Sequence, residues 1–310
     1  MTAANPIRPD AAIDAFQGDR AYLGADHRRN ERRTWAVACV CAVTLAVQLT
    51  AGRVFHSMAL TASGLHMAAH LAAMLVAAGA YAYARRHATD PRFAFGAGKL
   101  GFLAGFANAV VLAMTALMIG LESLRRLISP QAVDYGAALP VAVVGLAVTL
   151  ICVWLLRPPG RRHSDLNIGA AHLHLTADAA VGLLTISGLA AGHRLGWAWA
   201  DPLAGLAGAF LVAQFAVNLI RRTAATLLDM NPSAPLTAQI RRRLSARGET
   251  VLDLHLWSLG PGHHAAVAVV RADPPQPAEV YHRRLGGLAG LSHVTIEVRG
   301  PDDSDSHGHL

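Results

Sequence analysis

Residues 101–128 read GFLAGFANAVVLAMTALMIGLESLRRLI, and the architecture of the chain follows from this stretch. No Asp, Glu, Lys or Arg occurs in it before Glu122. A helix of about 20 apolar residues is long enough to cross the hydrocarbon core of a bilayer. Similar stretches lie on both sides of it, so the sequence predicts six membrane-spanning helices, at 34–52, 58–84, 101–128, 136–156, 168–192 and 198–220.

The charged residues divide the chain into two parts. Residues 34–220 contain 17 Asp, Glu, Lys or Arg among 187, whereas residues 221–310 contain 19 among 90. The whole chain is 53% hydrophobic and 15% charged, and ordinary soluble domains are about 25% charged. We therefore expect the first part to lie in lipid and most of the second part in water.

Basic residues gather at alternate ends of the predicted spans. The ends on one side carry only Arg53, Arg125, Arg126 and Arg194, and the other ends carry Arg28, Arg29, Arg32, Arg33, Arg85, Arg86, Arg92, Lys99, Arg157, Arg161, Arg162, Arg221 and Arg222. Cytoplasmic loops are enriched in Lys and Arg. This pattern predicts a bacterial-type inner-membrane protein with both termini in the cytoplasm, and it explains the net charge of +7 without a nucleic-acid partner.

Outside the spans, the composition predicts three further segments. Residues 1–33 form a polar cytoplasmic arm, and residues 301–310 a disordered tail. Between the spans and that tail, Pro232 is expected to end the last membrane helix. Residues 233–300 then form a small α+β domain of αββαβ order, with helices at 235–247 and 277–289 and strands at 250–259, 264–272 and 293–299.

Two pairs of polar side chains within the spans carry the chemistry. His66 and His70 are four residues apart in the second span, and His174 and Asp178 are four apart in the fifth. Residues at this spacing share one face of a helix. If the two helices face each other, three imidazoles and one carboxylate are enough for a four-coordinate site, and this ligand set favours Zn²⁺, Co²⁺ or Ni²⁺ over Mg²⁺ or Ca²⁺. The alternative is that these side chains pair with one another as core polar residues.

Several short motifs in a fixed order resemble those of the cation diffusion facilitators, and within that family the cobalt/nickel efflux branch. These are LGADH (23–27), SMAL (57–60), HMAAH (66–70), FGAGK (95–99), LAGF (103–106), LHLTADA (173–179), WADP (199–202), LLD (227–229), DLHLW (253–257) and LSHVTIE (291–297). The resemblance implies six spans, a cytoplasmic ferredoxin-like domain and a homodimer. It also implies a transport site of His66, His70, His174 and Asp178, the residues that helical spacing selects independently.

The resemblance further implies an ion pair between Lys99 and Asp229, joining the third and sixth spans near the dimer interface. The alternative is that Lys99 extends toward the membrane surface on its own and that Asp229 caps a helix end. His255 matches one family ligand of the cytoplasmic domain and is a candidate secondary metal ligand.

The chain also departs from the family pattern. Ser63 stands where that branch has an Asp, only His163 and Asp165 remain of a histidine-rich loop, and Phe93 and Ala97 replace loop ligands. We expect His263, His264, His282 and His293 to be surface side chains without a metal. The tail histidines His307 and His309 would bind an ion weakly at most.

From these features we expect a secondary active transporter rather than an enzyme. It would export Co²⁺ or Ni²⁺, with Zn²⁺ as a third candidate, in exchange for protons by alternating access. The metal is cargo, and no cofactor is expected. The competing hypotheses are an intramembrane metal-dependent enzyme, which would need more ligands or an adjacent general base, and a membrane metal sensor.

Overall fold

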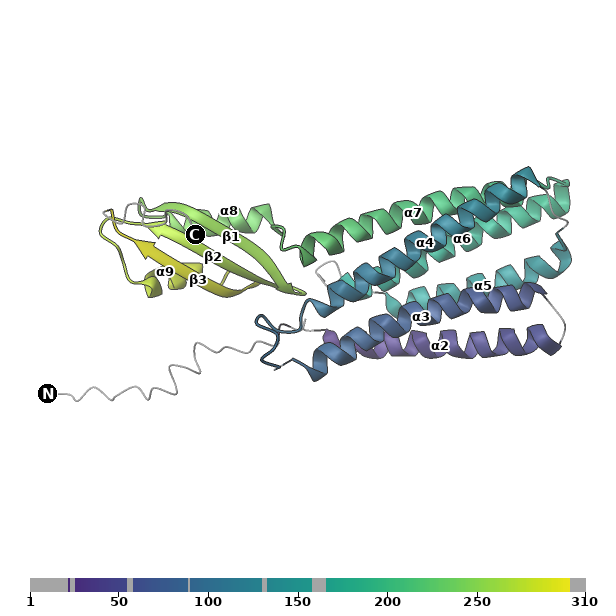
Figure 1. Ribbon diagram of the computed structural model, residues 1–310, viewed down its shortest axis with the longest axis horizontal. Helices are drawn as coiled ribbons and strands as arrows, with labels where there is room; N and C mark the ends of the chain where they lie inside the picture. The colour runs from purple at the N-terminus through teal and green to yellow at the C-terminus, as the bar shows by residue number, and fades with distance from the viewer. Residues whose placement is uncertain are drawn as a thin grey trace.

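The computed structural model describes residues 22, 26–54, 58–88, 90–129, 133–157 and 166–301. Within these residues, long helices run side by side as an elongated bundle, and a small α+β domain lies at one end of it (Figure 1). The long helices are α2 (His27–Val54), α3 (Met58–Arg86), α4 (Leu100–Ile128), α5 (Tyr135–Leu156), α6 (Leu166–Leu195) and α7 (Ala200–Leu227).

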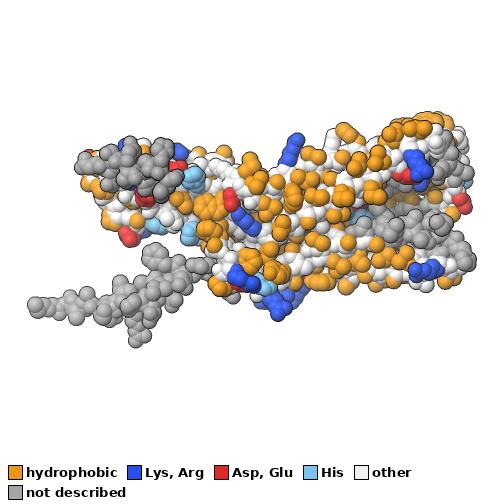
Figure 2. All heavy atoms as spheres, in the orientation of Figure 1, with side chains coloured by type: hydrophobic (Ala, Val, Ile, Leu, Met, Phe, Trp, Pro, Cys, Tyr) orange, Lys and Arg blue, Asp and Glu red, His pale blue; other side chains and the backbone are white. Residues whose placement is uncertain are grey.

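Counting only residues that the structure describes, five of these helices are long and apolar enough to cross a membrane: α2, α4, α5, α6 and α7. Large apolar side chains point outward from them, for example Val43, which is 64% exposed, and Met118, which is 70% exposed. Figure 2 shows hydrophobic side chains covering the visible face of the bundle. An apolar outer surface of this extent is expected of a protein that faces lipid, so the chain is a helical membrane protein.

Small residues allow the helices to pack closely. A Cβ added at Gly205 of α7 would lie 2.2 Å from Ser123 Oγ of α4, and one added at Gly188 of α6 would lie 2.9 Å from Ala204 Cβ of α7. Close approach of backbones over Gly, Ala and Ser is the usual packing mode of helices in lipid. The bundle interior therefore leaves little room for bulkier side chains at these two contacts.

The first and last long helices differ from their predicted limits. α2 begins at His27, seven residues before the predicted span, because polar residues on its first turns find partners: Glu31 accepts from Arg85, and Arg33 Nη1 donates to Arg157 O. Residues 27–33 are therefore helix rather than part of a polar arm.

α7 ends at Leu227, before Pro232, in a Schellman motif. Met230 N–H donates to Ala225 O at 2.9 Å, and Asp229 adopts a left-handed φ of 55°. The turn that ends the helix is thus made by the residues around Asp229 and not by the proline.

The C-terminal domain has the predicted element order: α8 (Ala234–Leu244), β1 (Thr250–Gly260), β2 (His263–Arg271), α9 (Ala278–Leu285) and β3 (Leu291–Arg299). The central strand β2 pairs antiparallel with β1 and parallel with β3. Alternate residues Ala266, Ala268 and Val270 of β2 are buried in one core with Ile240 and Leu244 of α8 and Tyr281 and Leu285 of α9.

The loop between α3 and α4 packs against this domain. The Phe95 ring packs edge-on against Trp257, with ring centroids 5.7 Å apart. At Gly98, an added Cβ would lie 2.4 Å from Leu259 O and 2.7 Å from Tyr22 O. Backbone segments of the loop, of β1 and of the N-terminal region therefore meet at a position that only glycine fits.

Candidate metal site

Two helices bring three of the predicted ligands together. His70 comes from α3, and His174 and Asp178 come from successive turns of α6. Asp178 Oδ2 lies 3.4 Å from His70 Nδ1 and 3.2 Å from His174 Nε2. The two imidazole rings are nearly perpendicular, with centroids 5.4 Å apart. One carboxylate oxygen therefore faces a ring nitrogen from each of the two helices.

These separations suit a metal ion. Ligand atoms about 2.0–2.1 Å from a tetrahedral zinc ion are about 3.3 Å from one another, close to the 3.2 and 3.4 Å observed here. Among the described residues, this is the one group of three His, Cys, Asp or Glu side chains placed closely enough to share an ion.

The cluster is buried. His70 is 3% exposed and His174 is 6% exposed, and the Asp178 side chain is 10% exposed. A buried carboxylate needs a compensating positive charge or several N–H donors. An ion held between the two imidazoles supplies such a charge, and a neutral imidazole supplies an N–H donor when no ion is bound.

His66, the fourth predicted ligand, lies one helical turn before His70 on α3, but its side chain is outside those that the structure describes. The same holds for Ser63. Residues His163, Asp165, His307 and His309 lie outside the described residues altogether.

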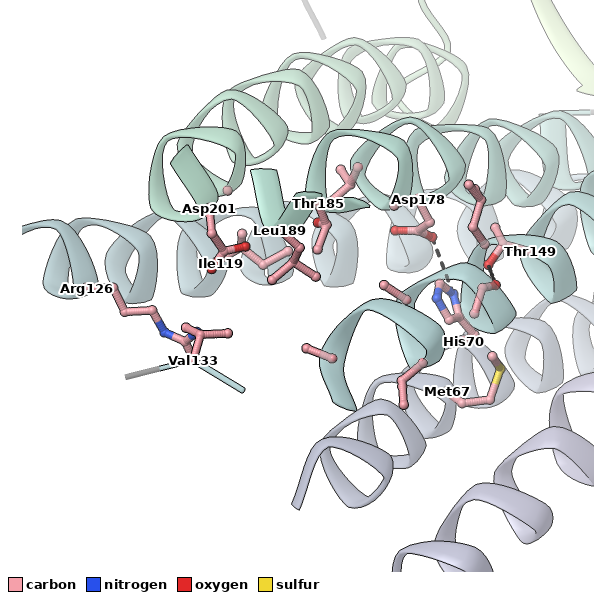
Figure 3. A pocket seen from close by; sticks show the side chains of 18 residues that line it. Met67, His70, Ile119, Arg126, Val133, Thr149, Asp178, Thr185, Leu189 and Asp201 are labelled. Atoms are coloured by element: carbon pink, nitrogen blue, oxygen red, sulfur yellow. Dashed lines mark hydrogen bonds and ion pairs between the residues drawn. The ribbon is translucent and has the colours of Figure 1, made fainter. Parts of the chain in front are cut away.

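A cavity of about 430 Å³ adjoins the cluster. His70, Met67 and Asp178 line one end, Thr149 and Thr185 add hydroxyl groups, and Arg126 and Asp201 line the other end (Figure 3). Arg126 lies near the end of α4 and Asp201 near the start of α7, which is the end of the bundle remote from the C-terminal domain (Figure 1). The cavity therefore extends from the buried cluster toward that end of the bundle.

The sequence did not single out Asp201 or the two threonines. Asp201 lies within the WADP motif, which is the only signal that could have marked it. Glu122, in contrast, accepts a hydrogen bond from Arg126 Nε at 2.9 Å near the end of α4 and does not line the cavity.

Lys99 and Asp229 lie together at the other end of the bundle, where Lys99 Nζ donates to Asp229 Oδ1. Lys99 precedes α4, and Asp229 follows α7. Both side chains are partly exposed. Asp229 therefore takes part in a helix end and in an ion pair at once, and Lys99 does not extend on its own.

The histidines of the C-terminal domain are dispersed. His255 pairs with Asp253 at 2.8 Å on the surface, His263 Nδ1 lies 2.8 Å from Ser292 Oγ, and His282 Nδ1 donates to Ala278 O at 2.8 Å. Burial lowers the pKa of His263 and of His264. Within the part of the chain that the structure describes, none of them joins a group of three ligands.

The chain is similar to known metal transport proteins over most of its length. A family model described as the cation efflux transmembrane domain matches residues 34–228. The zinc transporter ZitB of Escherichia coli is 31% identical over 234 residues, covering 74% of each chain.

Two relatives match over more of their length. A cadmium, cobalt and zinc/H(+)-K(+) antiporter of Bacillus subtilis is 25% identical over 93% of this chain and 94% of its own. The metal cation efflux system protein CzcD of Cupriavidus metallidurans is 27% identical over 89% of this chain and 90% of its own.

Proposed function

Since this chain belongs to the cation efflux family, we propose that it carries Co²⁺, Ni²⁺ or Zn²⁺ out of the cytosol in exchange for protons. Membership makes it a divalent metal cation efflux transporter and not an enzyme. The names of its relatives mention zinc, cadmium and cobalt, and the motifs quoted above favour the cobalt/nickel branch. First-row divalent ions share imidazole and carboxylate ligands, so one site serves all three cargo ions.

The observation that carries this proposal is the buried His70, His174 and Asp178 cluster at the inner end of the cavity. We assign His66 as the fourth ligand, because a helical turn separates it from His70 on the same face of α3. The ion would then bridge α3 and α6 with three nitrogen ligands and one oxygen ligand.

The proposed topology has six spans: the five helices named above and α3, which is the second span in chain order. Its 29 residues exceed the length that a bilayer requires. Both termini and the C-terminal domain then lie in the cytoplasm, where the Arg-rich helix ends also lie. In this topology residues 34–232 form the transport domain, and residues 233–300 form a ferredoxin-like domain. In this topology the cavity would open to the outside, and we assign this conformation to an outward-facing state. We further propose that the protein acts as a homodimer in the inner membrane.

Proton exchange follows from the ligand chemistry. Imidazole binds a metal ion only when the coordinating nitrogen is unprotonated, and its reference pKa is about 6.5. Protons and metal ions therefore compete for the same nitrogens near neutral pH. Protons that enter through the cavity would release the ion to the outside and return with the empty site.

Metal transport into liposomes that contain the purified protein tests the assignment of the metal ligands. We expect Asp178→Asn to lower the initial rate of Zn²⁺ or Co²⁺ flux about 100-fold or more, because the bound ion loses its anionic ligand in a buried site. The measurement is the signal of a metal-sensitive dye inside liposomes that contain the purified protein. His66→Ala should have a similar effect.

The matched control is Asp134→Asn. This change removes the same charge at the remote end of the bundle, and Asn keeps the helix cap that Asp134 provides to Ala137 N–H. Its flux should equal that of the parent protein. Parental flux in Asp178→Asn would show that the site is wrong, and flat traces for the parent protein with every metal would show that the cargo is wrong.

A further inference from the structure

A second pocket, of about 280 Å³, lies on the outer side of the bundle near the start of α2. It is lined by Arg28, Glu31, Arg32 and Trp35 of α2 and by Arg85 from the last turn of α3. The α2 residues occur at intervals of three and four, so they form one stripe along the helix. The pocket therefore combines one face of α2 with the end of α3.

The single carboxylate of this pocket is already occupied. Glu31 is buried and accepts two hydrogen bonds from Arg85, at 3.0 and 3.1 Å. This fork-shaped pairing neutralises Arg85 and fixes α2 against α3. The remaining charge of the pocket is the pair Arg28 and Arg32.

Two other arginines of the same helical segment have partners within the protein. Arg29 pairs with Asp26 at 2.7 Å, and Arg33 donates to Arg157 O at 2.8 Å. No carboxylate among the described residues pairs with the exposed side chains of Arg28 and Arg32. The pocket thus presents two guanidinium groups, one helical turn apart, to an outside anion.

The surface next to this pocket is apolar. Trp35 is 42% exposed one turn further along α2, and tryptophan is enriched at the membrane–water interface. The same side of the helix continues with the exposed residues Cys39, Ala42 and Ala46, and Val43 and Val47, which are 64% and 61% exposed, lie to one side of them. Figure 2 shows a group of Lys and Arg side chains on the lower edge of the bundle, close to the C-terminal domain and next to hydrophobic side chains.

We propose that this pocket binds the phosphate headgroup of an anionic phospholipid from the leaflet on the side of the C-terminal domain. The guanidinium groups of Arg28 and Arg32 hold the phosphate oxygens, which match the planar fork of arginine. The acyl chains then lie along the apolar stripe below Trp35. The apolar stripe identifies the anion as a lipid, because a free phosphate ion gains nothing from it.

A bound lipid has a structural consequence for transport. The headgroup would contact α2 at the point where Glu31 and Arg85 join it to α3, and α3 carries His70. The lipid therefore holds the α2–α3 pair at the membrane surface. This inference goes beyond the proposed cargo and does not depend on it.

Lipid binding by the full-length protein in detergent tests the inference. Native mass spectrometry would compare retention of phosphatidylglycerol and phosphatidylcholine by the parent protein and by the Arg28→Gln/Arg32→Gln variant. We expect the parent protein to prefer phosphatidylglycerol by about 30-fold, from two arginine–headgroup contacts near the membrane surface. The variant should lose this preference.

The matched control is Arg221→Gln/Arg222→Gln, which removes two exposed arginines at the same end of the bundle, on α7. It should keep the preference, because these residues do not line the pocket. An unchanged preference in Arg28→Gln/Arg32→Gln, or equal loss in both variants, would overturn the proposal. Displacement of the lipid by millimolar inorganic phosphate would identify an anion site and also overturn it. Gel-filtration profiles separate these outcomes from misfolding.

Discussion

At the scale of a single residue, Asp229 has two structural roles. It takes the left-handed conformation at the end of α7, a position that glycine usually fills. It also accepts a hydrogen bond from Lys99. Aspartate adopts this conformation more readily than most residues but less readily than glycine. The ion pair is thus obtained at a backbone position where glycine would be less strained.

Two substitutions separate the contribution of the ion pair from that of the backbone conformation. Asp229→Asn keeps the tolerance for the left-handed conformation and removes the charge, so it should lower stability by roughly 0.2–1 kcal/mol, as expected for a partly exposed ion pair. Asp229→Gly removes the same charge but relieves about 1 kcal/mol of backbone strain, so its loss should be smaller or absent. Thermal unfolding in detergent measures both. A double-mutant cycle with Lys99→Gln checks the pairing, and additive losses would show that the two side chains do not interact.

The site shows which residues a sequence can predict. His174 and Asp178 belong to one helix, so the 3.6-residue repeat alone places them on one face. The meeting of His70 with this pair depends on how α3 and α6 pack, which helical spacing does not determine, and the family resemblance supports it. Asp201 was missed because a single Asp at a helix start has no partner in the sequence that would mark it.

At the scale of the elements, the sequence predicted the interiors of the helices and strands better than their ends. The limits of β1, β2 and β3 agree within two residues because the turns between them follow Gly and Pro. The start of α2 was placed too late, since its first turns are polar and depend on the long-range contact between Glu31 and Arg85. The end of α7 depends on a backbone conformation at Asp229, which composition does not express.

Helix packing gives a prediction at the same scale. Gly188→Ala should destabilise the protein by about 1–3 kcal/mol, because the added Cβ would lie 2.9 Å from Asp201 Cα and 3.0 Å from Ala200 O. These are backbone neighbours that cannot move aside. Gly79→Ala on α3 should instead stabilise it by about 0.5–1 kcal/mol, because nothing lies within 4 Å of that Cβ. Melting temperatures in one detergent compare the two, and shifts of equal sign would contradict the packing of α6 against α7.

For the whole molecule, the proposed exchange of metal for protons predicts coupled flux. An imposed pH gradient across liposomes should drive metal ions in the direction opposite to the protons, because both compete for the same imidazole nitrogens. Metal affinity should fall as the pH falls through the range near 6.5 in which imidazole titrates. The measurement is initial dye signal with the membrane potential clamped. Flux that is indifferent to the gradient would exclude antiport and leave passive conduction.

The proposed ligands come from two different helices. His70 belongs to α3, whereas His174 and Asp178 belong to α6. In the proposed site the transported ion would cross-link α3 and α6, and each turnover would have to break that link. Among ions that share this site, tighter binding should mean longer residence, so the order of turnover rates should run opposite to the Irving–Williams order of affinities wherever release limits the cycle. The metal ion that binds the site most tightly would then inhibit transport rather than be transported.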